Sequence, residues 1–309
     1  MALDAAVADA LPLWTAASDV AARRIHVSEN VTFAVTGPGL DAVLRVHRPG
    51  YNDAGAIASE LAWLRALDAA EVLEVPRPVP MRDGTDIARI DGRHAVMFRR
   101  MPGRHPTPDG DLVGLFRWLG TAAARLHDHA ARWSPPDGFA RPRWDLDAAF
   151  GADAPWGDWR GAPGVDGAAR AVLEDAQARA EARLRTFGTG PDRFGLIHAD
   201  MRLANVLTDR AGRRLIDFDD CGFGWHLYDF AAAVSFWEDH PALPRWRAAW
   251  LAGYRVIRPI PPAHEAMLDD LILMRRLMLL AWIGTHPEAE DARRVAPGFA
   301  AGTVALAEG

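Results

Sequence analysis

Three polar residues in the second half of the chain have the types and spacing that phosphoryl transfer from a nucleotide requires. Asp200 and Asn205 share one short segment, and Asp217 follows about a dozen residues later. The reaction requires a carboxylate near the attacking hydroxyl and oxygen ligands for the metal ion that neutralises the phosphates. Asp200 can orient or accept the proton of an alcohol, while Asn205 and Asp217 offer the hard oxygen ligands that Mg²⁺ prefers. The spacing therefore predicts a magnesium-dependent phosphotransfer site.

Short apolar runs are expected to position these side chains. Residues 196–197 predict a buried strand that brings His198 to the start of a loop, from which Asp200 projects. The loop to Asn205 is long enough to reverse direction, so both side chains can face one cavity. An isolated histidine two residues before an aspartate is common, and His198 alone is more consistent with a structural role than with a chemical one.

The composition excludes several classes of protein. The chain has 309 residues, half of them hydrophobic, and a formal net charge of −6, so a globular protein that does not bind nucleic acid is expected. Cys221 is its one cysteine, which excludes an internal disulfide framework or a cysteine zinc cluster. Residues 271–283 are too few, and are interrupted by arginines, to span a membrane, and the acidic N-terminus is unlike a secretory signal. A cytoplasmic protein without membrane partners is expected.

The N-terminal third predicts a leading helix followed by a small antiparallel sheet. Residues 2–24 are alanine-rich with helical periodicity. Short runs separated by Gly, Pro and Asp then predict strands at 31–36, 42–47, 86–90 and 95–99. One helix interrupts them, with Asn52 as its expected N-cap and Glu60 beside its apolar stripe.

The rest of the chain is expected to be mainly helical. Residues 101–103 combine proline and glycine and predict a hinge. Residues 111–130 and 165–185 have helical periodicity, and they bracket a segment rich in Pro, Gly and Trp at about 133–164. Further helices are expected from residue 227 onward. The sequence therefore predicts an α+β protein with lobes at 1–101 and 102–309, the second carrying that segment as an insertion.

The spacing of the central motif resembles that of a known family. His198, Asp200 and Asn205, followed by Ile-Asp-Phe-Asp-Asp at 216–220, are similar to the catalytic loop and metal-binding turn of the aminoglycoside phosphotransferase-like kinases. That superfamily includes choline, homoserine and methylthioribose kinases and a bacterial stress-response serine/threonine kinase. The resemblance implies a protein-kinase-like bilobal fold that uses ATP and Mg²⁺, with the nucleotide in the first lobe and catalysis and substrate binding in the second. By this resemblance Asp200 is expected to be the catalytic base, and Asn205 and Asp217 are expected to hold the magnesium. His198 is expected to order the loop.

The N-terminal third agrees with this resemblance. Arg45 stands where the family places a strand lysine that contacts the α- and β-phosphates, and Glu60 stands where its helix partner is expected. The chain contains no lysine, so an arginine must take this position. The alternatives are an ordinary strand arginine and an exposed helix glutamate. Residues 28–30, which end at Asn30, resemble the turn that covers the triphosphate.

Farther along, Asp229 matches the aspartate with which the family braces its catalytic loop from below. Many members carry Gly-Asp-Pro just upstream, whereas this chain has Trp225 and His226 there, a departure that we expect to affect the acceptor side. The acidic run at 217–220 is closer to the stress-response branch. Asp219 or Asp220 could assist the metal or be merely solvated.

Several other side chains have two interpretations each. The insertion contains three tryptophans, Trp144, Trp156 and Trp159. They could line the acceptor pocket or pack the insertion onto its lobe. His127 is expected to be a hydrogen-bonded buried helix histidine. The acidic pairs 238–239 and 269–270 could attract a cationic substrate, although such pairs are usually solvated helix faces.

Four functions remain open at this point. The first is an ATP- and magnesium-dependent phosphotransferase acting on a hydroxyl of a small molecule, which could be cationic, and the second is a protein kinase acting on serine or threonine. The third is a metal-dependent phosphohydrolase with His198, Asp200 and Asp217 as ligands, and the fourth is a non-catalytic nucleotide-binding module. The sequence leaves ATP and GTP both open as the donor and does not indicate an oligomeric state.

Overall fold

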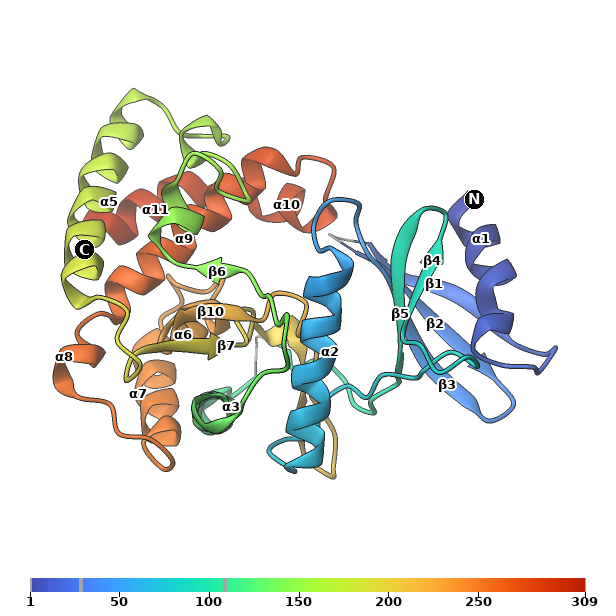
Figure 1. The fold of residues 1–309 in the computed structure, drawn as a ribbon. Helices are drawn as coiled ribbons and strands as arrows, with labels where there is room; N and C mark the ends of the chain where they lie inside the picture. Colours follow the sequence, from blue (N-terminus) through green and yellow to red (C-terminus); the bar gives the residue numbers. More distant parts are fainter. Residues whose placement is uncertain (1, 28–29, 108–109, 309) are drawn as a thin grey trace. The chain divides into compact units, whose positions relative to one another are not determined.

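The computed structural model describes residues 2–27, 30–107 and 110–308, which form two compact units. The first contains Met1–Arg104 with two later segments, Pro135–Arg141 and Leu207–Asp219, and the second contains the remainder. The first unit carries an antiparallel sheet and the second is mainly helical (Figure 1), which confirms the α+β class. The division into lobes at residue 101 stays a prediction.

The sheet of the first unit has five strands in the order β1-β2-β3-β5-β4, and every neighbouring pair is antiparallel. Its strands are β1 (Ala21–Val27), β2 (Val31–Gly37), β3 (Leu40–Val46), β4 (Ile87–Ile90) and β5 (Arg93–Arg99). Side chains of β2 and β3, including Phe33 and Leu44, form a core with Val7 of α1 (Ala2–Ala10). Burial of this apolar face is what holds α1 on the unit.

Two sequence predictions in this unit are wrong in detail. The leading helix ends at Ala10 and a 3₁₀ turn over Leu11–Leu13 follows, whereas Ala21–Val27 form a strand. The next helix, α2 (Ala54–Ala69), begins one residue later than expected: Asp53 is its N-cap, and its carboxylate accepts the backbone N–H of Ala56 at 2.8 Å. Asn52 has a different partner, described below.

The second unit is built from helices around a small three-stranded sheet in the order β6-β10-β7. The sheet strands are β6 (Arg143–Trp144), β7 (Phe194–Ile197) and β10 (Gly222–Trp225). The long helices are α3 (Val113–Arg132), α5 (Gly167–Phe187), α7 (Leu243–Tyr254) and α9 (Leu268–Thr285). The shorter elements are α4 (Leu146–Phe150), η2 (Trp159–Gly161), η3 (Leu203–Asn205), α6 (Tyr228–Ala233), α8 (Pro262–Glu265), α10 (Glu290–Val295) and α11 (Phe299–Glu308).

Two glycines allow α3 and α7 to pack with their backbones in contact. A Cβ on Gly120 would lie 1.9 Å from the carbonyl oxygen of Trp250, and a Cβ on Gly253 would lie 1.9 Å from that of Arg117. No larger residue fits at either position without moving a helix. This crossing fixes α3, which carries His127, within the second unit.

A short hairpin carries the segment that contains Asp217. Its strands are β8 (Val206–Thr208) and β9 (Arg213–Leu215), and residues 207–219 belong to the first unit. Among the residues that the structure describes, no helix is both long enough and apolar enough to cross a lipid bilayer.

Candidate active site

The loop that carries Asp200 begins where β7 ends. Leu196 and Ile197 are buried as the sequence predicts, and β7 pairs with β10, so the position of His198 is set by the sheet. Ala199 then adopts a positive φ of 67°, which is uncommon for a residue with a side chain. This turn and the 3₁₀ turn at Leu203–Asn205 reverse the chain, and they bring Asp200 and Asn205 side by side.

Both oxygens of the Asp200 carboxylate are held by the protein. Asn205 Nδ2 donates to Oδ2 at 2.7 Å and to the Asp200 carbonyl at 2.9 Å, and Arg202 Nε donates to Oδ2 at 3.0 Å. Arg275 Nη2 donates to Oδ1 at 2.8 Å. Burial alone would raise the pKa of Asp200, but the two guanidinium groups outweigh it and lower the pKa below its usual value. The carboxylate is therefore ionised and fixed in orientation.

Asp229 supports this loop from beneath. Its Oδ1 accepts the backbone N–H of Ala199 at 2.7 Å, and its Oδ2 accepts that of His198 at 3.2 Å. Nδ1 of His198 accepts the backbone N–H of Asp200 at 3.2 Å, and the ring is fully buried. The ring of His198 is thus buried and hydrogen-bonded to the backbone of the loop that carries Asp200.

His127 of α3 completes this support. Its Nε2 donates to Asp229 Oδ2 at 2.9 Å, and its Nδ1 accepts the hydroxyl of Tyr254 at 3.0 Å. Burial lowers the pKa of His127 well below its usual value, so the ring is neutral with its proton on Nε2. The expectation of a buried, hydrogen-bonded helix histidine is confirmed.

In the first unit, β3 and α2 bring Arg45 and Glu60 together. Arg45 Nη2 lies 2.5 Å from Glu60 Oε2, and Arg45 Nη1 lies 3.2 Å from Asp217 Oδ1. Burial raises the pKa of Glu60, while Arg45 opposes that rise. Glu60 is buried, so it is not the exposed helix glutamate of the alternative interpretation, and Arg45 is buried as well.

Asp217 has two features of a functional position. Its φ is 64°, a left-handed conformation that costs a non-glycine residue of order 1 kcal/mol or more. Its side chain is 44% exposed although neighbouring Phe218 is fully buried. A strained backbone that presents a carboxylate to solvent is typical of residues that hold a ligand.

Asp219 organises the same unit. Asn30 Nδ2 donates to its Oδ2 at 2.6 Å, and Asn52 Nδ2 donates to its Oδ1 at 3.1 Å. Arg141 donates to its backbone carbonyl. Asp219 is thus buried and hydrogen-bonded rather than solvated. The roles of Asn52 and Arg141 cannot be predicted from local pattern, because their shared partner Asp219 lies far along the chain.

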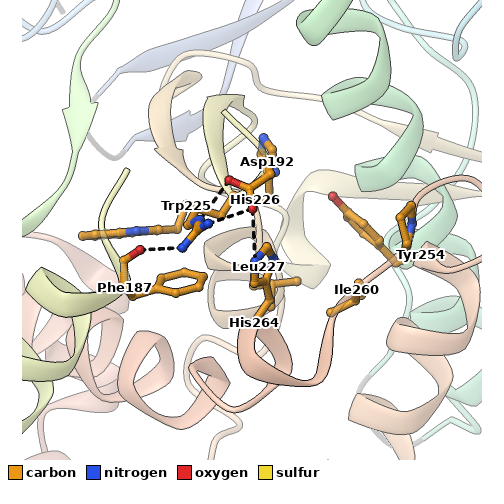
Figure 2. Close-up of a pocket in the computed structure, with 10 residues that line it drawn as sticks. Phe187, Asp192, Trp225, His226, Leu227, Tyr254, Ile260 and His264 are labelled. Atoms are coloured by element: carbon orange, nitrogen blue, oxygen red, sulfur yellow. Dashed lines mark hydrogen bonds and ion pairs between the residues drawn. The ribbon is translucent and has the colours of Figure 1, made fainter. Parts of the chain in front are cut away.

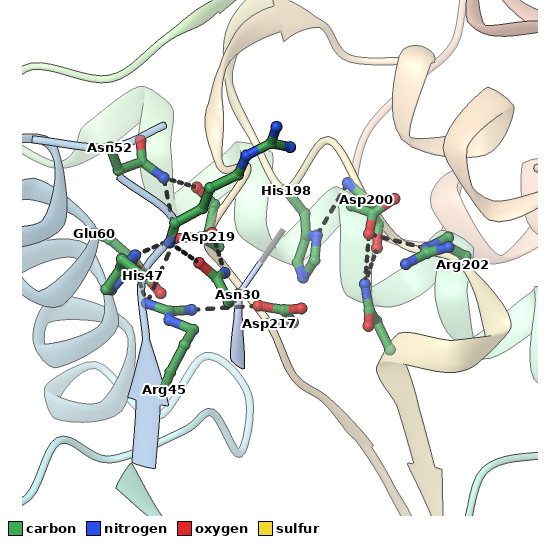
Figure 3. A network of polar contacts seen from close by, with 12 residues as sticks. Asn30, Arg45, His47, Asn52, Glu60, His198, Asp200, Arg202, Asp217 and Asp219 are labelled. Atoms are coloured by element: carbon green, nitrogen blue, oxygen red, sulfur yellow. Dashed lines mark hydrogen bonds and ion pairs between the residues drawn. The ribbon is translucent and has the colours of Figure 1, made fainter. Parts of the chain in front are cut away.

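The structure therefore assembles the predicted site residues in two groups (Figure 3). The first unit brings Arg45 and Glu60 together with Asp217, and holds Asn30 on Asp219. The second unit groups the catalytic-loop residues, namely His198, Asp200 and Asn205. Residues 28 and 29 of the predicted triphosphate turn lie outside the described residues.

The tryptophans of the insertion are buried against the second unit. Trp159 Nε1 donates to Gln177 Oε1 at 2.8 Å, and Trp144 Nε1 donates to the carbonyl of Asp220 at 2.7 Å. Trp156 lies 5.6 Å from Trp144, measured between ring centroids, and its ring also faces the guanidinium of Arg275. The packing interpretation holds for all three, and Trp156 in addition contacts a residue that holds Asp200.

Trp225 and His226 are both buried in the second unit. Trp225 Nε1 donates to the carbonyl of Gly188 at 2.8 Å, and the ring of His226 stacks on His127 at 4.7 Å. Figure 2 shows both among the residues around a cavity of about 10 Å³, which is large enough for about one water molecule. Both side chains are buried, so the departure from the family at this position lies in the interior of the second unit, and its effect on the acceptor side stays a prediction.

The acidic pair at 238–239 is also placed differently from expectation. Glu238 is buried, and its Oε2 lies 2.5 Å from Nη1 of Arg276. It is therefore neutralised by an ion pair and is not part of a solvated helix face.

Asn205 and Asp217 each offer an oxygen atom of the kind that a magnesium ion prefers. The amide nitrogen of Asn205 is occupied by Asp200, so its amide oxygen is the atom that remains for a ligand. Asp217 offers a carboxylate that is partly exposed. Within the described part of the chain, no three His, Cys, Asp or Glu side chains cluster in a way that could hold a metal.

Comparison with known proteins gives the family. The model of the phosphotransferase enzyme family matches residues 22–267, which is most of the chain. The chain belongs to the phosphotransferase enzyme family. This phosphotransferase is also 42% identical to a microcompartment-associated aminopropanol kinase of known structure, with a TM-score of 0.90 and coverage of 98% of this chain and 95% of that one.

Two further relatives agree. A homoserine kinase from Acidiphilium cryptum is 30% identical over 254 residues, which cover 76% of this chain and 74% of that protein. The structure of an amicoumacin kinase in complex with AMP-PNP, Ca²⁺ and amicoumacin is 18% identical and shares the fold with a TM-score of 0.78, covering 97% of this chain and 92% of that one. The phosphotransferase thus has the protein-kinase-like fold that the motif implies, and it catalyses ATP-dependent transfer to a hydroxyl of a small molecule. Neither the protein kinase nor the non-catalytic alternative is favoured.

Proposed function

We propose that this phosphotransferase transfers the γ-phosphate of Mg-ATP to the hydroxyl of a small amino alcohol. The observation that carries the proposal is the arrangement at Asp200, where an ionised carboxylate is held by Asn205, Arg202 and Arg275. Such a group orients an alcohol for attack and accepts its proton as the new bond to phosphorus forms. Asn205 and Asp217 would hold the magnesium, which neutralises the phosphate charge when bound.

Arg45 is assigned to the phosphates. A buried guanidinium in contact with two carboxylates is rigid, and its planar fork can also bind phosphate oxygens in a fixed direction. Glu60 would then hold Arg45 in place, as a glutamate on the helix holds a strand lysine in related enzymes. Because ATP is the donor, we also propose the cytoplasm as the compartment in which the enzyme acts.

The class of acceptor is inferred from charge and from the relatives. An aminopropanol kinase and a homoserine kinase are both named for acceptors that combine an amine with a hydroxyl. The net charge of −6 favours a cationic acceptor over an anionic one. We therefore expect a positively charged amine near the reacting hydroxyl to be part of what the enzyme recognises.

The test is the release of ADP from Mg-ATP with matched acceptors. We expect turnover with 1-amino-2-propanol or a close amino alcohol, and much less with 2-propanol, which has the same hydroxyl without the amine. Homoserine, choline and ethanolamine complete the panel, and GTP replaces ATP in one arm. Equal rates with and without the amine would contradict the acceptor class, and an Asp200→Asn variant that keeps wild-type turnover would contradict the assigned chemistry.

A further inference from the structure

Arg275 of α9 lies enclosed beside the catalytic loop and has a different partner for each of its nitrogen atoms. Nη2 donates to Asp200 Oδ1 at 2.8 Å, Nη1 to the hydroxyl of Tyr228 at 3.2 Å, and Nε to Oγ of Ser235 at 3.2 Å. The rings of Trp156 and Tyr228 lie near the guanidinium, with centroids 5.1 and 5.8 Å from its carbon. Only 2% of the residue is exposed, so the guanidinium is enclosed by the protein and held by these partners.

The two oxygens of Asp200 are held unequally. Oδ2 accepts hydrogen bonds from both Asn205 and Arg202, whereas among the described residues Oδ1 accepts one only from Arg275. A carboxylate oxygen accepts about two hydrogen bonds readily. Oδ1 is therefore the oxygen with capacity left for the hydroxyl of an acceptor.

We propose that Arg275 is a positioning residue that fixes Oδ1 of Asp200 in the direction of the acceptor hydroxyl. The proposal rests on the proposed function, because it takes Asp200 as the group that orients this hydroxyl. The terminal torsion of an aspartate is broad, so a carboxylate held only at Oδ2 can rotate about that oxygen. Arg275 provides the second point of attachment, and Tyr228 and Ser235 hold Arg275 itself.

The role requires an arginine rather than a positive charge alone. The three partners lie in different directions, and a planar guanidinium reaches all three from one position. A lysine would keep the charge but would present a single ammonium group, which cannot serve Asp200, Tyr228 and Ser235 together. Arg275→Lys therefore separates orientation from charge.

The neighbouring Arg276 provides a matched control. It is equally buried and also has three partners: Nη1 contacts Glu238, Nε donates to Thr303 Oγ1 at 3.0 Å, and Nη2 donates to the carbonyl of Phe299 at 3.4 Å. These partners join α9 to α11 and to the chain after α6, and none of them has a place in the proposed chemistry. Arg276→Lys should therefore lower stability without a selective effect on turnover.

The experiment compares Arg275→Lys and Arg276→Lys with the wild type in kcat, in KM for ATP and acceptor, and in Tm, with kinetics measured well below each Tm. We expect Arg275→Lys to lower kcat about tenfold or more while KM for ATP stays within about twofold, because nucleotide binding is untouched and only the acceptor is misaligned. We expect Arg276→Lys to lower Tm while kcat stays within about twofold. Equal kcat losses in the two variants, or a wild-type kcat in Arg275→Lys, would overturn the proposal.

Two further variants complete the test. If Arg275→Lys does not fold, the double variant Tyr228→Phe with Ser235→Ala releases the guanidinium but keeps its charge. A fall in kcat without a change in KM for ATP then supports the proposal, and an unchanged kcat overturns it. Asp200→Asn separates the two levels of inference: if it is inactive while Arg275 variants are normal, only the role of Arg275 is wrong, and if it is active, the assignment of Asp200 is wrong.

Discussion

Nε2 of His127 lies 2.9 Å from Oδ2 of Asp229, and both side chains are fully buried. Burial raises the pKa of Asp229 to about 6, and the hydrogen bonds it receives from the loop backbone oppose that rise. Above that pH the carboxylate is ionised and accepts from the ring of His127 and from two backbone N–H groups of the catalytic loop. One carboxylate thus connects α3 to the loop that carries Asp200.

The first prediction concerns the Asp229→Asn variant. An amide has one acceptor oxygen where the carboxylate has two, so a buried N–H of the loop loses its partner. An unsatisfied buried donor costs about 1–3 kcal/mol, and we expect the free energy of unfolding to fall by that amount in denaturant titration. We also expect kcat to fall about tenfold because the loop is no longer fixed. Tyr254→Phe removes only the hydroxyl on the far side of His127 and should leave kcat nearly unchanged; equal kcat values for the two variants would contradict this explanation.

The second prediction concerns Arg45→Lys. A lysine at this position is what the family usually has, but here the surroundings are built for a guanidinium that reaches Glu60 and Asp217 at once. The ammonium of a lysine loses at least one of these charge-assisted hydrogen bonds, each worth about 1.5–3 kcal/mol. We expect KM for ATP to rise about tenfold while KM for the acceptor stays the same.

Arg89→Lys is the control for that change, because Arg89 is an exposed arginine of β4 in the same sheet. It should leave both Michaelis constants unchanged. If Arg45→Lys also leaves KM for ATP unchanged, Arg45 does not contact the phosphates.

The sequence predicts those helices and strands in which the local pattern of apolar residues matches the face that the fold buries. The stripe of Ile57, Leu61 and Leu64 gives α2, and the β-branched run that begins at Val31 gives β2, because each buries one apolar face. The residues of β1 (Ala21–Val27) overlap at 21–24 with the range that the sequence predicts as helical, because residues 2–24 are alanine-rich with helical periodicity. They form a mostly exposed edge strand that pairs with β2, for example Ala21 opposite Thr36.

In the candidate site, too, positions set by a short local segment can be predicted from the sequence, whereas contacts between distant segments cannot. The types and spacing of Asp200 and Asn205 predict that both side chains can face one cavity, since five residues of loop suffice to reverse the chain. The structure adds the hydrogen bond between them. Arg275 could not be assigned in this way. In the sequence it interrupts an apolar helix, and only the fold shows that its partner Asp200 is 75 residues earlier. Contacts of this kind depend on tertiary packing, which the local periodicity of the sequence does not reveal.

The third prediction concerns the crossing of α3 and α7. A Cβ on Gly120 would lie 1.9 Å from the carbonyl oxygen of Trp250, so Gly120→Ala must push the two helices apart. We expect the free energy of unfolding to fall by about 1–3 kcal/mol, the range found for overpacked cores. Gly167→Ala at the start of α5 is the matched control, because a Cβ there meets no atom within 4 Å. The control should be neutral or slightly stabilising, and a Gly120→Ala variant as stable as the control would show that the crossing is not tight.

The fourth prediction concerns the pH dependence of stability through His226. Burial, with His127 as a lesser cause, lowers the pKa of His226 to about 2, whereas in the unfolded chain it is near 6.5. Below pH 6.5, His226 therefore binds a proton in the unfolded state but not in the folded state. The stability that is present above pH 6.5 is lost as the pH falls toward 2. Between pH 7 and pH 5 this one group should cost about 2 kcal/mol.

The measurement is the free energy of unfolding of the wild type and of His226→Gln at several values of pH from 7 to 5. Glutamine does not titrate, so the difference between the two proteins isolates His226 from Asp229, whose raised pKa acts in the opposite direction. We expect the variant to lose about 2 kcal/mol less than the wild type over this range. Parallel curves for the two proteins would mean that His226 can be protonated in the folded state, and that the stack of His226 on His127 does not exclude the charged form.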